Sequence, residues 1–160
     1  MATITNLVCE YRDNPLGIDI TRPRFGWQLQ SDKTGARQTA YQIKAASSAE
    51  QLKAGQSDVW DSGKVESDQS IHVMYAGKAL SSRQRVYWTV TVWDESGSAI
   101  QGDTKWFELG LLERTDWKGE WVGTALRGGP RSLIPAPMLR KTLTLANAPK
   151  SARLYVTALG

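Results

Sequence analysis

An eight-residue run near the middle of the chain constrains the fold more than any other feature. Residues 86–93 read VYWTVTVW, so every position is β-branched or aromatic. These residue types lose rotamer freedom in a helix and pack well on a pleated, half-buried surface. The run therefore predicts a strand, and its apolar character places that strand at the centre of a sheet.

Shorter segments with the same two-residue period lie on both sides of this run. Phe25, Trp27 and Leu29 alternate with small or polar residues, which turns one face of a strand inward. Further strands are predicted at residues 4–11, 41–46, 59–65, 71–75 and 105–109. Turn-forming residues separate these segments, so about seven short strands precede Gly110.

Seven short strands at fairly even spacing predict an all-β fold, an immunoglobulin-like or fibronectin-III-like antiparallel β-sandwich. Periodicity alone does not separate a sandwich from a small barrel, so a barrel stays the alternative. One short helix is predicted at residues 49–54, capped by Ser47 or Ser48 and ended by Gly55.

The tryptophans are the unusual part of the composition, with seven Trp against two Phe. Large flat rings suit the thin core of a two-sheet fold. Trp27, Trp88 and Trp106 fall in alternating strands and are predicted core residues. Trp60, Trp117 and Trp121 lie near turns or the connector, and an exposed indole among them could stack on a sugar ring.

The character of the sequence changes after Leu112. We predict a sandwich domain at residues 1–112, a polar connector at 113–120 and the incomplete start of a second β-sandwich at 121–160. Within that last part the predicted elements are a Gly/Pro-rich loop at 127–137 and strands at 139–145 and 152–159. Two or three strands cannot bury a core alone. The tail is therefore expected to dock on the first domain or to belong to a larger second one.

No residue is predicted to be catalytic, cofactor-binding or metal-binding, and no cofactor is expected. The chain has one histidine, His72, set in a strand whose inward residues would be Ile71, Val73 and Tyr75, and one cysteine, Cys9. One histidine and one cysteine are too few ligands for a transition-metal site. His72 is interpreted as a structural residue and not as a catalytic base. Three acidic pairs, at 58 and 61, 66 and 68, and 94 and 95, lie in turns, where carboxylates serve the backbone.

Charge and hydropathy exclude two classes of partner. The net charge of +4 comes from basic residues scattered among acidic ones, so no nucleic acid is expected as a partner. No apolar run approaches the roughly 20 residues of a membrane span, so no membrane is expected either. The N-terminal residues lack the pattern of a signal peptide, which favours a cytoplasmic location.

Several recognisable motifs occur in a fixed order along the chain. The clearest are PRFGW at 23–27, VWDSGKV at 59–65 and YWTVTVWD at 87–94. The others lie at residues 14–19, 38–43, 106–112, 116–117, 137–141 and 152–160. Together these motifs resemble the N-terminal region of bacterial α-L-rhamnosidases of glycoside hydrolase family 78, and those at 137–141 and 152–160 are similar to the start of a second β-sandwich in those enzymes.

The resemblance implies a piece of a multidomain enzyme that removes terminal α-L-rhamnose by an inverting mechanism. It places the acidic catalytic residues on a helical (α/α)6 barrel far downstream, so none is expected in this chain. The implied role is a non-catalytic accessory module whose partners are the downstream domains. Two alternatives remain, a carbohydrate-binding module for rhamnosylated substrates and a free-standing interaction sandwich. Self-association through unpaired strand edges at 139–145 and 155–159 is also expected.

Overall fold

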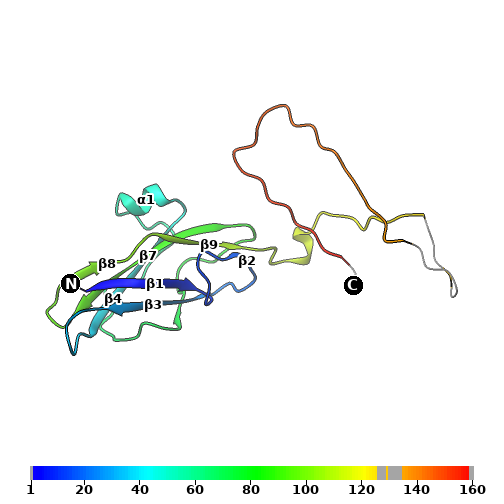
Figure 1. Cartoon of the computed structure of the whole chain (residues 1–160). Helices are drawn as coiled ribbons and strands as arrows, with labels where there is room; N and C mark the ends of the chain where they lie inside the picture. The colour runs from blue at the N-terminus through cyan, green and yellow to red at the C-terminus, as the bar shows by residue number, and fades with distance from the viewer. Residues whose placement is uncertain (1, 126–128, 130–134, 159–160) are drawn as a thin grey trace. The chain divides into compact units, whose positions relative to one another are not determined.

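The computed structural model describes residues 2–125, 129 and 135–158. The chain divides into two units, Met1–Lys118 and Gly119–Gly160. All the named helices and strands belong to the first unit (Figure 1). The sequence-based boundary at 113–120 stays a prediction, and the two units are described separately.

The first unit is a β-sandwich built from two sheets (Figure 1). The smaller sheet has the order β1 (Thr3–Cys9), β3 (Arg24–Gln30), β6 (Val73–Met74), with antiparallel neighbours. The larger sheet has the order β2 (Leu16–Ile18), β9 (Lys105–Leu109), β7 (Arg85–Asp94), β4 (Gln38–Ala46), β5 (Trp60–Asp61), and β8 (Ala99–Gln101) also pairs with β7. The prediction of an all-β, immunoglobulin-like fold is confirmed, and β7 is the central strand that its residues predicted.

Two short strands were not predicted from the sequence. Strand β2 pairs in parallel with β9, and β8 pairs antiparallel with the C-terminal half of β7. Around β2, the backbone N–H of Gly110 donates to the oxygen of Ile18 (2.7 Å), and that of Trp106 donates to the Asn14 side chain (2.8 Å). Backbone pairing defines both strands, for β2 with a segment far along the chain and for β8 with the adjacent end of β7, and such pairing leaves no alternating side-chain pattern in three residues.

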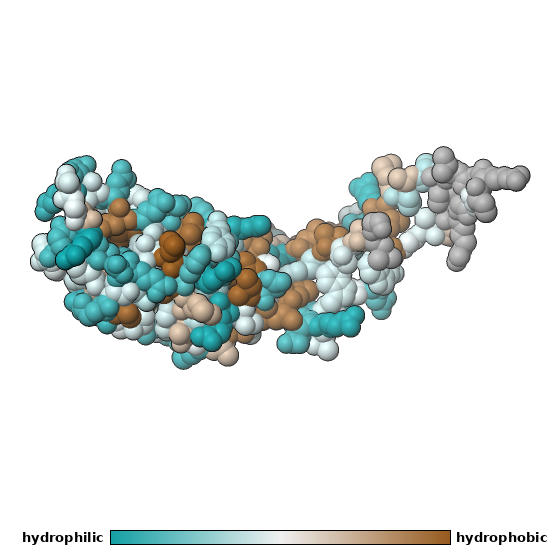
Figure 2. All heavy atoms as spheres, turned by 90° about the horizontal axis from the view of Figure 1, so that it is seen from below, coloured by the Kyte–Doolittle hydropathy of each residue, from teal (hydrophilic) through white to brown (hydrophobic). Residues whose placement is uncertain are grey.

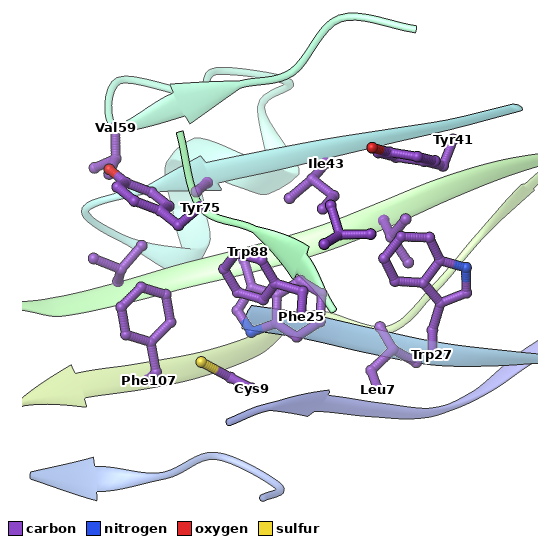
Figure 3. Packing of buried hydrophobic residues seen from close by; sticks show 14 of the residues in the cluster. Leu7, Cys9, Phe25, Trp27, Tyr41, Ile43, Val59, Tyr75, Trp88 and Phe107 are labelled. Carbon is purple, nitrogen blue, oxygen red and sulfur yellow. The ribbon is translucent and has the colours of Figure 1, made fainter. Parts of the chain in front are cut away.

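The core lies between the two sheets, where side chains from both inner faces meet (Figure 3). Phe25 of β3 lies near its centre, with its ring centroid 4.5 Å from that of Trp88 and 5.9 Å from that of Phe107. Trp27 and Trp88 are 1% and 0% exposed, as predicted. Complete burial of one such side chain stabilises the fold by roughly 1.5–3 kcal/mol.

Two core predictions were wrong. Trp106 is only half-buried, because Phe107 and Leu109 take the inward positions of β9 and leave Trp106 on the outer face. Ile71 is 61% exposed, since β6 begins only at Val73 and His72 adopts φ 56°, which breaks the alternation. The inward positions of Val73 and Tyr75 are as predicted.

The predicted helix is present as α1 (Ala49–Lys53), on the outside of the sandwich (Figure 1). The Ser48 hydroxyl caps it by accepting a hydrogen bond from the Gln51 backbone N–H at 3.2 Å. Gly55, at φ 77°, ends it in the left-handed region that glycine adopts readily. Leu52 is the buried residue of this helix.

The second unit contains no named helix or strand among its described residues, 119–125, 129 and 135–158. The strands predicted at 139–145 and 152–159 are not formed over 139–145 and 152–158, and residue 159 lies outside the described residues. Most of the predicted loop at 127–137 also lies outside them. Two or three strands without a covering layer bury too little apolar surface to fix their own pairing.

Candidate functional site

The candidate site is a small pocket on the outward side of the three-stranded sheet, here called the outer-face pocket. Its volume is about 200 Å³. Its lining consists of Val8, Tyr11, Arg24, Phe25, Gly26, Ile71 and His72. Other apolar side chains also reach the surface of the sandwich, as small separate patches among hydrophilic ones (Figure 2).

Strand geometry places these residues together. Phe25 and Trp27 face the core, so Arg24 and Gly26 face outward from β3. A bulge in β1 between Thr5 and Val8 brings Val8 opposite Gly26. A Cβ at position 26 would be 3.4 Å from Val8 Cγ2, so any larger residue there would occupy the floor of the pocket.

The polar groups around the pocket are paired with one another. Glu10 Oε1 accepts hydrogen bonds from the Arg24 backbone N–H (2.6 Å) and Nε (3.1 Å), and its Oε2 accepts from Nη2 at 2.7 Å. The Tyr11 hydroxyl is 2.9 Å from His72 Nε2, and the Arg24 guanidinium lies 5.1 Å from the Tyr11 ring centroid. Hydrogen bonding from Arg24 lowers the pKa of Glu10, so Glu10 stays ionised and neutralises Arg24. The pocket surface between these pairs is apolar.

The backbone around the pocket is strained. Glu10, Tyr11 and His72 adopt φ values of 46°, 62° and 56°. Residues other than glycine occupy this region at a cost that the surrounding structure must hold in place, and such residues gather at functional sites. Two of the three line the pocket, and the third forms the ion pair beside it.

The structure places the two residues with nucleophile or base chemistry on opposite sides of the small sheet. His72 is exposed at the rim of the pocket, hydrogen bonded to Tyr11, whereas Cys9 is 1% exposed in the core. Burial raises the pKa of the Cys9 thiol far above its ordinary value. No group of three or more potential metal ligands occurs among the described residues.

The acidic residues in the turns mostly accept hydrogen bonds from backbone N–H groups. Asp94 Oδ1 accepts from the N–H groups of Ser96 (2.9 Å) and Ser98 (3.0 Å), which closes the turn after β7. These hydrogen bonds, with that of the Ser96 hydroxyl first, lower the pKa of Asp94. Comparable bonds join Asp58 to Ser47 N–H, Asp61 to Gly63 N–H and Glu95 to Arg37 N–H, and Glu66 pairs with Lys64 at 2.9 Å.

Most tryptophan rings of the first unit are buried or covered by other side chains. Trp60 packs against the core, with its ring 6.0 Å from Phe25. Lys64 lies over Trp93 at 5.0 Å, and the Arg85 guanidinium covers Trp106 at 4.2 Å. Trp117 is 38% exposed, and Trp121 of the second unit is 67% exposed. Among the described residues, the ring contacts of tryptophan are with Phe25, Tyr41 and Tyr75.

Sequence reasoning missed the outer-face pocket. Its residues come from three segments, around positions 8–11, 24–26 and 71–72. The one signal available was Gly26, because a glycine inside an alternating strand marks a close approach or a missing side chain.

Among the described residues, no helix is long and apolar enough to cross a membrane.

Two packed, mainly antiparallel sheets of short strands define an immunoglobulin-like β-sandwich module. Within this class, residues 4–113 match the family described as "Rha78A-like, N-terminal immunoglobulin domain". This match covers more than half of the chain, and the chain belongs to that family.

The curated relatives are much longer proteins. An α-L-rhamnosidase of Streptomyces avermitilis is 42% identical over 137 residues, covering 85% of this chain and 13% of the relative. An α-L-rhamnosidase of Formosa agariphila is 41% identical over 154 residues, covering 92% of this chain and 16% of the relative. The chain thus spans about one-seventh of the length of these relatives.

Solved structures agree with this placement. The S. avermitilis α-L-rhamnosidase complexed with L-rhamnose is similar with a TM-score of 0.73 and 43% identity, over 77% of this chain and 12% of that one. The α-L-rhamnosidase of Dictyoglumus thermophilum is similar with a TM-score of 0.72 and 35% identity, over 76% and 14%.

Proposed function

We propose that this chain is the N-terminal accessory module of an α-L-rhamnosidase, and that it positions neighbouring domains and performs no chemistry itself. The observation that carries the proposal is the match of residues 4–113 to the N-terminal immunoglobulin domain family. The parent enzyme would hydrolyse terminal α-L-rhamnose from glycosides with inversion, using acidic residues outside this chain. The module's partners would be the downstream domains.

The side-chain chemistry of the sandwich supports the non-catalytic role. A glycosidase needs two carboxyl groups about 5–9.5 Å apart facing a substrate cleft. Asp58, Asp61, Asp94 and Glu95 are instead engaged by backbone N–H groups of their own or neighbouring turns. Glu10 and Glu108, which are nearly buried, are each paired with an arginine.

The direct test compares the isolated chain with the full-length parent on an aryl α-L-rhamnoside. We expect no release of the aryl group above the blank from the chain and clear hydrolysis by the parent. Deleting residues 1–118 from the parent should lower its thermal stability or soluble yield, because neighbouring domains lose a packing partner. Hydrolysis by the isolated chain would contradict the non-catalytic role, and an inactive parent would contradict the assignment as a whole.

Calorimetric titration separates the structural role from a carbohydrate-binding role. Because most Trp rings of the sandwich are buried or covered, those of Trp93 and Trp106 by Lys64 and Arg85, we expect no saturable heat with L-rhamnose or a rhamnosylated flavonoid. Trp117 and Trp121 are the exposed rings that saturable heat would implicate. A control sugar should give the same flat trace. Saturable heat with L-rhamnose alone would favour the carbohydrate-binding module.

A further inference from the structure

We infer that the outer-face pocket is a docking site for another domain of the same polypeptide. One apolar side chain of that domain would occupy the pocket. The inference rests on the proposed function and adds the surface that does the docking. The pocket lies on the outward side of the β1–β3–β6 sheet, and its lining residues Tyr11, Ile71 and His72 are exposed.

The chemistry of the pocket suits an apolar side chain better than a sugar. Tyr11 and Ile71 expose 64% and 61% of their surface, and Met74, which pairs with Arg24 across β3 and β6, exposes 51%. A sugar needs several unpaired donors and acceptors, but Arg24 Nε and Nη2 already donate to Glu10 and the Tyr11 hydroxyl is hydrogen bonded to His72. The pocket surface between these groups is mainly apolar, so it favours an apolar contact.

The dimensions agree with this occupant. A volume of about 200 Å³ holds one aliphatic or aromatic side chain. Typical small-molecule sites are larger, at about 300–1,000 Å³. The binding energy of protein interfaces is concentrated in such small pockets, where Tyr and Arg are enriched and surrounding contacts exclude water.

The pocket is also held in shape before binding. The Glu10–Arg24 ion pair, the Tyr11–His72 hydrogen bond and the guanidinium beside the Tyr11 ring fix the rim from three sides. Glu10, Tyr11 and His72 adopt left-handed backbone conformations, and Tyr11 and His72 are exposed where they line the pocket. A preformed pocket loses less conformational entropy on docking than a flexible one.

We expect the docking side chain to come from another domain of the same polypeptide, because this chain matches only a small fraction of the length of its relatives. It accounts for 13% and 16% of the two curated α-L-rhamnosidases compared above, so most of each relative lies outside the matching region. The ion pair beside the pocket is internally neutralised. The group that docks is therefore expected to be uncharged and apolar.

Hydroxyl-radical footprinting tests the inference, because Tyr11, His72 and Met74 are reactive side chains at or beside the pocket. Labelling is compared between the 160-residue chain and the full-length parent, each as wild type, Ile71→Asp and Gln28→Asp. Gln28 is the matched control, since it is exposed on the same outward face of β3, two residues beyond Gly26, and does not line the pocket.

We expect labelling of Tyr11 and Met74 to fall several-fold in the wild-type parent relative to the isolated chain. Ile71→Asp should restore it to the level of the isolated chain, and Gln28→Asp should leave the protection unchanged. Because Ile71 is mostly exposed, both variants should melt like the wild type as isolated chains, which controls for misfolding.

Equal labelling of Tyr11 in chain and parent would overturn the inference, as would identical behaviour of the two variants. Protection of Tyr11 in the isolated chain by L-rhamnose would assign the pocket to a sugar, and protection that grows with chain concentration would assign it to a second copy. Either result overturns the docking role. If the parent hydrolyses rhamnosides while the pocket stays open, only this inference fails and the proposed function stands.

Discussion

The two units of this chain carry similar strand-like patterns but differ in structure. In the sandwich, alternating segments such as β3 and β7 bury one face against the other sheet. In the second unit, residues 139–145 read LRKTLTL with comparable alternation, yet Leu139, Leu143 and Leu145 are 57%, 76% and 62% exposed. The difference teaches that alternation gives a segment the capacity to form a strand, and that a covering layer is needed to realise it.

The largest difference between the units should appear when a tryptophan is removed from each. Trp88→Ala empties a fully buried site between the sheets and should destabilise the sandwich by about 3–5 kcal/mol. Trp121→Ala, at a 67% exposed position of the second unit, should change the free energy of unfolding by less than about 0.5 kcal/mol. Urea denaturation followed by circular dichroism measures both. Similar shifts for the two variants would remove the contrast.

Adding a methyl group instead of removing a ring gives a smaller contrast. A Cβ at Gly77 would stand 2.5 Å from Trp60 Cβ and 2.6 Å from the Tyr75 hydroxyl, whereas one at Gly123 would meet no atom within 4 Å. Gly77→Ala should therefore cost about 1–3 kcal/mol through overpacking. Gly123→Ala should leave the urea midpoint unchanged. An unchanged urea midpoint for Gly77→Ala would show that the residues around position 77 move apart at little cost in free energy.

Lowering the pH should destabilise the sandwich because Glu10 becomes protonated. Its pKa is lowered in the folded state, first by the hydrogen bond from Arg24. A depressed carboxyl pKa stabilises the fold above the unfolded-state value near 4.5, and this stabilisation is lost as the pH falls through the lower folded value. Glu10→Gln should therefore lower the melting temperature at pH 7, by less than Gly77→Ala does. In this variant the melting temperature should also decrease less steeply between about pH 5 and 3. Parallel profiles for the two proteins would contradict this role.

The smallest expected effect is weak self-association through the second unit. Exposed apolar residues and unpaired backbone at 139–145 favour pairing with another copy. Light scattering after size exclusion should show a mass that rises with concentration. Thr144→Pro should reduce the rise, because proline removes a backbone donor from a pairing strand. A strict monomer at high concentration would mean that the exposed leucines do not promote pairing.

The sequence predicted those parts of the fold that side chains dictate. Strand β7 and helix α1 were foreseen because β-branched residues and a Ser48 cap act locally. Strands β2 and β8, of three residues each, were missed because backbone pairing defines them, for β2 with the distant β9 and for β8 with the adjacent end of β7. Trp106 was misassigned because residues 105–109 contain adjacent aromatic residues, so the pattern does not say which of them faces inward.

The outer-face pocket could not be predicted for a related reason. Val8, Gly26 and Ile71 come together only after β1, β3 and the segment before β6 are in register. The left-handed conformation of His72 moves Ile71 from the expected core position to the surface. Neither the register nor that conformation leaves a mark in the composition or spacing of the residues.

The pairing of β2 with β9 has a consequence for how the protein is made. Residues 14–18, near the start of the chain, are hydrogen bonded to residues 106–110, at the end of the sandwich. A ribosome releases the first of these segments long before the second, so the β2 edge stays open until synthesis passes Gly110. Contacts that span so much sequence also slow folding. The sandwich can therefore be completed only after residues 106–110 are available, and the strand edge that they cover is exposed until then.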